Sequence, residues 1–283
     1  MFAILLAAAS ALIWGTADYS GGRASRRVPA LRVAVLSKVF SLPALALYLV
    51  LTPGRPTGAA ALWGAAAGMI GLVALVIFYS TLSAGAMSVV APVAAVTTAV
   101  LPFTVGLVAG DRPGTLALIG VACAVLAIAL VSLTRDASPE RRVTPALVGR
   151  AMAAGAGFGL FFVLLDIANG SAGDPGLWPV AAAQVGALAI GGVLLARAPR
   201  SGSAPLRGGL LLWLTAAGVL DMTANALYLV AARDGMLAVV APVAALYPVS
   251  TVLLALALDR ERVRPVQVAG LGLAVAALVL VAS

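Results

Sequence analysis

The heptapeptide Val-Val-Ala-Pro-Val-Ala-Ala occurs at Val89–Ala95 and again at Val239–Ala245, 150 residues later. The same offset aligns other residues without a gap from Gly58 to the end of the chain, including Trp63 with Trp213. Short matches of alanine and valine are common in a chain rich in both, but matches that include tryptophan and proline are not. The sequence therefore indicates that one structural unit is duplicated.

The composition is that of a membrane protein. The chain has 283 residues, of which 63% are hydrophobic and 10% are charged, and its mean hydropathy is +1.11. A soluble domain carries roughly 25% charged residues. No single soluble core could take up this much apolar surface, so the lipid bilayer is the expected solvent and partner. The net charge of +8 does not predict nucleic-acid binding, because the arginines fall in short gaps between apolar runs.

Several classes of site are disfavoured by residues that the sequence lacks. It contains no histidine and a single cysteine, Cys123, which lies within an apolar run. We therefore expect no disulfide within the chain, and no metal site or cofactor. No Gly-x-x-x-x-Gly-Lys-Ser/Thr loop is present, so the chain has no ATPase of its own. The first apolar run ends without a signal-peptidase pattern, and we expect it to remain as a membrane span.

Ten stretches are long enough to cross a bilayer, which takes about 20 mainly apolar residues. They do not alternate with period two, which argues against strands. The stretches are 2–20, 29–51, 58–82, 86–109, 114–134, 145–168, 175–196, 208–231, 236–258 and 265–282. The sequence therefore predicts an all-α integral membrane protein with ten transmembrane helices. Glycines one turn apart are expected to let helices pack closely. These pairs are Gly64/Gly68, Gly106/Gly110 and Gly155/Gly159.

The duplication divides the ten spans into two groups of five. The longest polar segment, 135–144, is expected to link a first repeat at 1–134 to a second at 145–283. Because five is odd, the second copy enters the membrane in the opposite orientation. Inverted repeats of this kind are typical of secondary transporters, since two conformations of one unit can close one side of a cavity while opening the other. The sequence thus predicts two inverted five-helix repeats and alternating access.

The basic residues predict an orientation. Fourteen arginines fall in gaps on one side of the expected bundle and three on the other. The first side carries Arg23, Arg26, Arg27, Arg32, Arg135, Arg141, Arg142, Arg150, Arg197, Arg200, Arg207, Arg260, Arg262 and Arg264; the second carries Arg55, Arg112 and Arg233. Cytoplasmic loops are enriched in Lys and Arg, so the bias places both chain termini outside the cytosol.

Loose motifs carry a resemblance to a known family. They are Trp14-Gly15, Ala91-Pro92-Val93, Ala241-Pro242-Val243, and the acidic residues Asp111 and Glu261, each followed by an apolar stretch. Together with the repeat, they resemble the drug/metabolite transporter superfamily, specifically its EamA-type ten-span members. The resemblance implies two inverted five-helix bundles around a central cavity, and movement of small metabolites or drugs across the cytoplasmic membrane. It also implies that both termini lie in the cytosol, against the charge bias.

Asp221 is the first candidate for the transport site. An ionised side chain at the centre of a membrane helix costs about 2.5–3.5 kcal/mol, so such groups are functional candidates. Asp221 lies near the middle of its stretch, with Asn225 and Tyr228 on the same helical face. The aligned positions in the first half are Gly71, Leu75 and Phe78. This polar stripe therefore belongs to one repeat, and serves either substrate and proton binding or a structural ion pair.

Three further candidates lie in the first two stretches. Lys38 either meets Asp221 across the cavity or extends its ammonium to the membrane interface. Asp18, one turn after Trp14, either serves transport or caps a helix near the headgroups. Trp14 is a candidate through the family resemblance alone.

The remaining candidates are neutral side chains and prolines. Tyr247, Ser250 and Thr251 share one face, and Thr97 and Thr98 occupy the aligned place in the first half. These hydroxyls either bind substrate or bond to carbonyls freed by nearby prolines. Pro92 and Pro242 are either hinges or first-turn prolines that begin their helices. Gln184 is expected to form an interhelical hydrogen bond, and Asp166 and Asp174 to be solvated.

The sequence as a whole predicts a secondary transporter, with proton-coupled export as its candidate mode. Its expected partners are a small metabolite or drug-like solute, the lipid bilayer and protons. Amino acids, lipophilic cations and sugar-like metabolites all suit the candidate side chains. One alternative is a non-transporting scaffold or assembly subunit, which the polar stripe disfavours. Another is a lipid-modifying membrane enzyme, which the lack of histidine and of carboxylates clustered beside a nucleophile disfavours.

Overall fold

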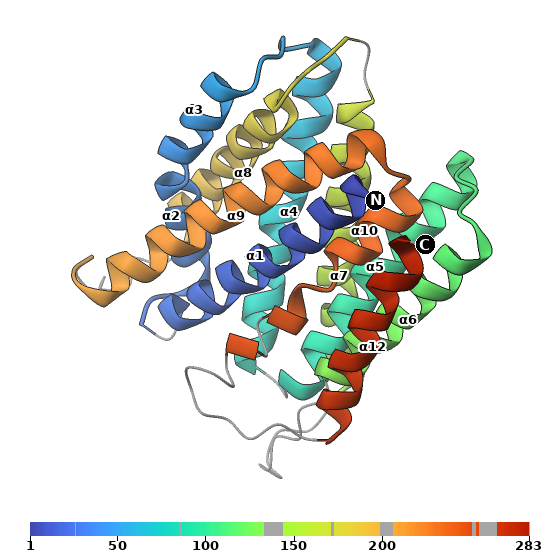
Figure 1. Ribbon diagram of the computed structural model, residues 1–283. Coiled ribbons are helices and arrows are strands. Elements are labelled where there is room, and N and C mark those ends of the chain that lie inside the picture. The colour runs from blue at the N-terminus through green and yellow to red at the C-terminus, as the bar shows by residue number, and fades with distance from the viewer. Residues whose placement is uncertain are drawn as a thin grey trace.

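The computed structural model describes residues 1–25, 27–84, 87–132, 144–170, 173–198, 206–250, 253–254 and 265–282. Within these ranges the regular elements are helices, and no strand occurs. The helices lie side by side as a bundle of long rods (Figure 1). The all-helical prediction is therefore confirmed for the described residues. Thr251, Glu261 and most of the expected linker lie outside them.

The helices follow the apolar stretches of the sequence. The first half contains α1 (Phe2–Ser25), α2 (Ala30–Phe40), α3 (Leu42–Leu51), α4 (Gly58–Ala84), α5 (Met87–Ala109) and α6 (Thr115–Ser132). The second half contains α7 (Pro145–Asn169), α8 (Trp178–Arg197), α9 (Gly209–Asp234), α10 (Leu237–Ala244) and α12 (Pro265–Ala282). Most boundaries fall within about three residues of the predicted ones, because the glycines, prolines and arginines that interrupt the apolar runs also end the helices.

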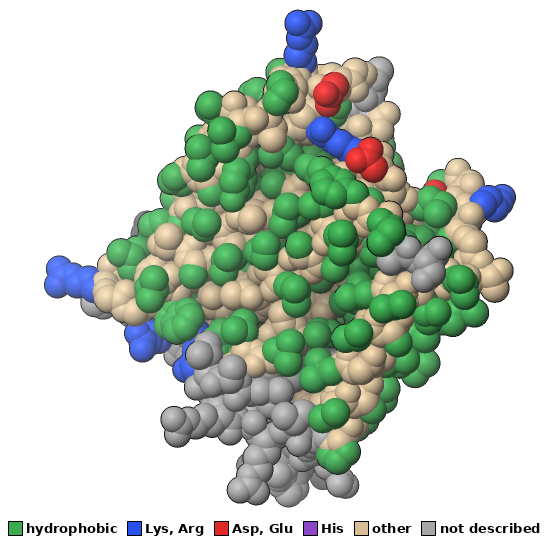
Figure 2. All heavy atoms as spheres, viewed as in Figure 1, with side chains coloured by type: hydrophobic (Ala, Val, Ile, Leu, Met, Phe, Trp, Pro, Cys, Tyr) green, Lys and Arg blue, Asp and Glu red, His purple; other side chains and the backbone are tan. Residues whose placement is uncertain are grey.

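The bundle has the surface of a multi-pass membrane protein. Six described segments are long and apolar enough to cross a membrane: α1, α2 with α3, α4, α7, α8 and α9. Four shorter apolar helices are also present, at Val93–Ala109, Thr115–Leu130, Leu237–Ser250 and Pro265–Val281. Large hydrophobic side chains point outward, and Val50 and Val108 are 83% and 84% exposed. On the face shown, hydrophobic side chains cover the middle, while charged ones lie at the edges (Figure 2).

Two predicted spans are interrupted. A proline lacks an N–H and clashes with the carbonyl four residues before it. The stretch at 29–51 divides at Ser41, just before Pro43, into α2 and α3. The stretch at 236–258 breaks after Ala244, four residues before Pro248, and is helical again at 247–250. The break at Ser41 corrects the expectation of one continuous helix at 29–51. The break in 236–258 agrees with the hinge alternative offered for its prolines.

The two hinge candidates both lie within helices. Pro242 is inside α10, so it is not a first-turn proline, and the break at residues 245–246 follows it by one turn. Pro92 lies within α5, which continues to Ala109. The side chain of Pro92 is outside the described part of the structure.

The packing joins the two halves of the chain. Helix α1 packs along α9, α4 along α7, and α6 along α12 (Figure 1). Glycines permit close approach as predicted at Gly64, Gly68, Gly155 and Gly159, where an added Cβ would meet the backbone or side chains of a neighbouring helix. Gly106 faces Ala238 of α10 in the same way, whereas Gly110 serves a turn, with φ of +114°.

Candidate functional site

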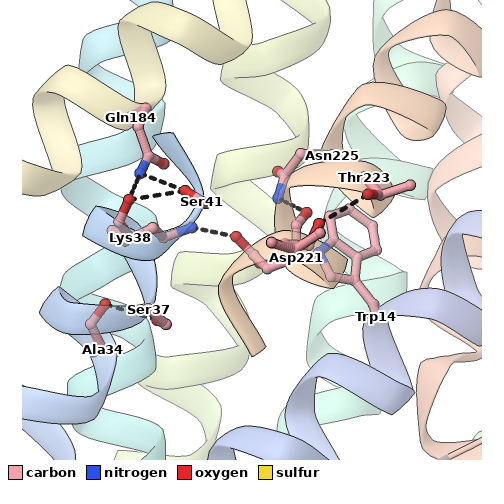
Figure 3. Close-up of polar contacts among 10 residues, drawn as sticks. Trp14, Ala34, Ser37, Lys38, Ser41, Gln184, Asp221, Thr223 and Asn225 are labelled. Carbon is pink, nitrogen blue, oxygen red and sulfur yellow. Dashed lines mark hydrogen bonds and ion pairs between the residues drawn. The ribbon is translucent and has the colours of Figure 1, made fainter. Parts of the chain in front are cut away.

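An ion pair links the two halves near the middle of the bundle. The Nζ of Lys38 on α2 lies 2.5 Å from Oδ2 of Asp221 on α9. The two side chains are 17% and 27% exposed. Of the two alternatives for Lys38, the structure therefore has the ammonium meeting Asp221 rather than extending to the membrane interface (Figure 3).

Trp14 and Asn225 fix the acidic end of this pair. The indole Nε1 of Trp14 on α1 donates to Oδ1 of Asp221 at 3.3 Å. The amide of Asn225, one turn along α9, donates to the backbone carbonyl of Asp221 at 2.6 Å. The carboxylate of Asp221 thus bonds to one partner on α1 and one on α2. The Asn225 amide bonds only within its own helix, to the Asp221 carbonyl.

Gln184 on α8 holds the basic end. Its amide donates to the backbone carbonyl of Lys38 and to the hydroxyl of Ser41, the latter at 2.8 Å. The Ser41 hydroxyl in turn donates to the carbonyl of Lys38 at 2.8 Å. These polar groups lie at the break between α2 and α3, where the regular helical bonding is interrupted (Figure 3). The expected interhelical role of Gln184 is confirmed, and it positions the backbone that carries Lys38.

The ion pair borders a cavity at the centre of the bundle. The cavity has a volume of about 100 Å³, counted as the space open to the centres of water molecules. Its lining comes from α1, α2, α4, α5, α7, α8 and α9, together with Tyr247. The charged residues of the lining are Asp18, Lys38 and Asp221. A cleft of this kind, mostly apolar with a few convergent polar groups, is typical of a small-molecule site.

A second, smaller pocket meets the first at the charged residues. Asp18, Lys38, Leu75 and Asp221 line both. The second pocket extends toward the end of α1 and the start of α2, where Gly21 and Val33 lie, and toward the first half of α9. That end of the bundle is the arginine-rich side identified from the sequence. The Lys38–Asp221 pair thus lies between the central cavity and this side.

Positions that are related by the 150-residue offset line the same cavity. Asp221, Met222 and Asn225 line it from α9. Their partners at the 150-residue offset are Gly71, Leu72 and Leu75, and these line it from α4. The polar stripe and its apolar counterpart therefore form two walls of one cavity.

An aromatic wall lies on α7, which the sequence analysis did not identify. Phe158, Phe161 and Phe162 line the cavity. The ring of Phe162 lies 5.3 Å from that of Trp14 and is stacked on that of Tyr228 at 4.6 Å. The helical spacing of these phenylalanines was a usable signal, but in so apolar a stretch it does not distinguish a cavity face from a lipid face.

The predicted tyrosines separate into two kinds. Tyr247 lines the cavity. Tyr228 is fully buried outside the cavity lining, with its hydroxyl 3.5 Å from the carbonyl of Phe162. Tyr228 therefore packs behind the aromatic wall.

The predicted hydroxyl residues mostly bond to backbone. Thr97 donates to the carbonyl of Val93 at 2.7 Å and is outside the cavity lining. Thr98, its neighbour, lines the cavity and donates to backbone on α5 and α7. Ser250 donates to the carbonyls of Ala11 at 3.3 Å and Tyr247 at 3.0 Å. Back-bonding, one of the two alternatives, is therefore what the structure has for Thr97 and Ser250.

The other acidic residues that the structure describes are not part of the cavity lining. Asp174 is exposed and lies 3.6 Å from Arg233, as expected for a solvated group. Asp166 is half-buried near the end of α7. Asp111, noted for its motif, accepts a hydrogen bond from the backbone N–H of Ala238 at 2.8 Å and so fixes the start of α10. Among the described residues, no cluster of three potential metal ligands occurs.

Comparisons with known proteins agree with this architecture. A family model described as the EamA-like transporter family matches residues 1–133 and 145–283. Among solved structures, 27 chains match. One, described only as a crystal structure of a protein, is 14% identical, with a TM-score of 0.78 over 98% of this chain and 95% of that chain. At this identity the likeness shows the fold alone. A search of curated proteins gave no significant match.

Proposed function

This chain belongs to the EamA-like transporter family, and we propose that it is a secondary transporter that moves a small metabolite or drug-like solute across the cytoplasmic membrane by alternating access. Membership supports a membrane transporter of the drug/metabolite superfamily. The mode of movement, the coupling to protons and the direction of transport are parts of this proposal.

The proposal includes ten spans arranged as two inverted five-helix repeats. Six long and four shorter apolar helices support the number of spans. The packing supports a two-fold relation between the repeats: exchanging them converts the pairing of α1 with α9 into that of α7 with α4, and both are observed. The odd number of spans in each repeat then makes the relation an inversion. The gap between the two family matches falls at the linker expected from the sequence, between repeats at 1–134 and 145–283.

The observation that carries the proposal is the Lys38–Asp221 ion pair at the cavity. It joins a helix of the first repeat to a helix of the second, and both pockets meet there. Substrate and ion sites of such transporters lie near the mid-plane at the interface of the repeats. In this proposal, separation of the pair opens a path between the central cavity and the arginine-rich side.

The break at Ser41 supplies a place where α2 can reorient. Hinges are element-terminal residues that take up the change in backbone angles. A change there would move Lys38 relative to Asp221 without disturbing the closely packed helices on the other side of the cavity. Asp221 and Asp18 are the candidate groups for proton exchange, because they are the carboxylates of the described cavity lining.

Transport assays in proteoliposomes would test the proposal. The purified full chain is reconstituted, and uptake of a panel of labelled amino acids, amines and sugars is measured with and without a pH gradient, with a pH-sensitive dye inside. Uptake of at least one solute above that of empty liposomes is expected. Uptake indistinguishable from that of empty liposomes across the panel would contradict a transporter.

Two sets of variants separate a transport role of the ion pair from a structural one. Asp221→Asn leaves Lys38 without its partner and should lower both stability and uptake, since removing one member of a partly buried pair leaves a desolvated charge uncompensated. The double variant Lys38→Met with Asp221→Leu replaces the pair by apolar groups and should restore stability but not uptake. Wild-type uptake by the double variant would show that the pair is only structural. Asp174→Asn, which breaks the exposed pair with Arg233, is the control.

A further inference from the structure

The charged side chains of the cavity lining are two carboxylic acids and one amine within the described residues. They are Asp18, Asp221 and Lys38. Lys38 and Asp221 neutralise each other at 2.5 Å. In the part of the chain that the structure describes, the carboxylate of Asp18 makes no hydrogen bond or ion pair. When both acids are ionised, the site therefore lacks one positive charge.

Asp18 lies where a bound solute could reach it. It follows Trp14 by one turn of α1, so the two side chains share a helical face. Both residues line the central cavity, and Asp18 also lines the second pocket. Asp18 thus borders both pockets that meet at the Lys38–Asp221 pair.

The rest of the lining suits an organic cation. Trp14, Phe158, Phe161, Phe162 and Tyr247 contribute aromatic rings. The faces of such rings attract ammonium groups, and they also pack against apolar groups. A charge that enters an apolar cavity needs a partner of opposite sign to offset the loss of water. Asp18 would supply that partner, and the rings would hold the remainder of the molecule.

The same lining is poorly suited to anions. Lys38 is the basic residue of the described lining, and its ammonium is already bound to Asp221. A substrate carboxylate would have to break that pair to find a cation. A zwitterionic amino acid would meet the same cost at its carboxylate.

Given the transporter proposed above, we infer that its substrate is a monovalent organic amine with an aromatic or aliphatic body, and that Asp18 is the counter-ion of its ammonium group. The Lys38–Asp221 pair remains intact while the amine occupies the central cavity. Asp18 thus distinguishes amines from amino acids and from organic acids.

Four phenyl compounds that differ mainly in charge test this inference. Phenethylamine is a cation, phenethyl alcohol is neutral, phenylalanine is a zwitterion and 3-phenylpropionate is an anion. Binding to the detergent-purified full chain is measured by thermal stabilisation and calorimetry. Phenethylamine is expected to bind at least about tenfold more tightly than the others, equivalent to about 1.4 kcal/mol. These measurements need only the wild-type protein. If the alcohol binds as tightly as phenethylamine, or phenylalanine or phenylpropionate binds more tightly, the inference is overturned.

Variants of Asp18 then assign the site. Asp18→Asn should weaken phenethylamine binding at least about tenfold, and Asp18→Glu should retain most of it. Asp234→Asn removes an exposed carboxylate at the end of α9 and should bind like the wild type. Size-exclusion profiles check that each variant is folded. Unchanged binding by Asp18→Asn overturns the assignment.

Failure of this inference is distinguishable from failure of the proposed function. If proteoliposomes accumulate phenylalanine or a sugar and the protein does not bind phenethylamine, the chain is a transporter and the inference about amines is wrong. If Asp18-dependent binding of phenethylamine is found but no solute is transported, the site exists and the transporter proposal is wrong.

Discussion

The helix pairs α4–α8 and α9–α2 border the same cavity but are held together differently. Between α4 and α8, Gly64, Gly68 and Gly186 each lie against the backbone of the opposite helix. Between α9 and α2, Gly218 alone does so, against Ser37. Gly68 and Gly218 are related by the 150-residue offset. The glycine contact is thus repeated along the α4–α8 interface and single at the α9–α2 interface.

The difference indicates which interface can change shape. Backbone contact along several turns leaves no room for sliding, because close-packed interfaces do not deform continuously. At the α9–α2 interface the single glycine contact is followed by an ion pair, and α2 ends at Phe40. Ionic contacts can separate and re-form as water or a solute enters. In the proposed mechanism, α4–α8 is therefore the fixed wall and α9–α2 the moving one.

The largest expected effect is the loss of the fixed wall in Gly68→Leu. A side chain at this position would overlap the backbone of Ala183. Because the overlap is with backbone atoms, no change of side-chain rotamer can relieve it. We expect a loss of at least about 3 kcal/mol of stability, at the upper end for overpacked cores. Thermal unfolding of the purified protein, followed by size exclusion, measures this loss.

Gly192→Leu is the matched control on α8. An added Cβ at Gly192 meets no neighbouring atom, and the residue is exposed. This variant should unfold like the wild type. Equal stability of Gly68→Leu and Gly192→Leu would mean that the α4–α8 contact is not the rigid element.

Gly218→Leu sharpens the comparison by making the same change in the other half. Its side chain would meet the backbone of Ser37, close to the end of α2. Because α2 is short and can shift at the break, we expect a smaller loss, of about 1–3 kcal/mol. A loss as large as that of Gly68→Leu in the same unfolding assay would show that the two interfaces are equally rigid.

The sequence predicted the helices well and the site only in part. Gly, Pro and Arg ended the apolar runs, and these local signals also end helices. Asp221 and Lys38 were identified because a charge within a membrane span is costly, whatever its neighbours. The aromatic wall at Phe158, Phe161 and Phe162 was missed. In a span that is apolar on every face, sequence alone does not reveal which face meets the cavity.

The division of α2 from α3 was missed because the contact that supports it is not local in the sequence. Pro43 signals a possible break, but the stretch around it is long enough to be read as one span. The break is supported by Gln184 of α8, whose amide bonds to the Lys38 carbonyl and the Ser41 hydroxyl. That contact joins residues 146 positions apart, and no local pattern predicts it.

Gln184→Leu tests whether this contact supports the moving wall. The variant removes the amide but leaves the Ser41 hydroxyl bonded to the Lys38 carbonyl. We expect a loss of about 1–2 kcal/mol, typical of one or two buried hydrogen bonds, and lower uptake in proteoliposomes because Lys38 is less well positioned. Thr104→Ala, which removes an exposed hydroxyl bonded to its own helix, is the control. Unchanged stability and uptake in Gln184→Leu would show that the Gln184 amide does not position Lys38.

The smallest effect on stability is expected for Pro43→Ala, which bears most directly on how the moving wall works. Pro43 lies in the first turn of α3, where proline stabilises a helix start, so alanine should change stability by no more than about 1 kcal/mol. The new N–H can bond across the break and join α2 to α3, which would stiffen the wall that carries Lys38. We therefore expect uptake to slow several-fold while binding is retained. Pro145→Ala makes the same change at the start of α7, directly after the N-cap Thr144, and should leave uptake unchanged. If the two alanine variants transport equally fast, reorientation does not occur at Ser41, and the break between α2 and α3 only shapes the resting cavity.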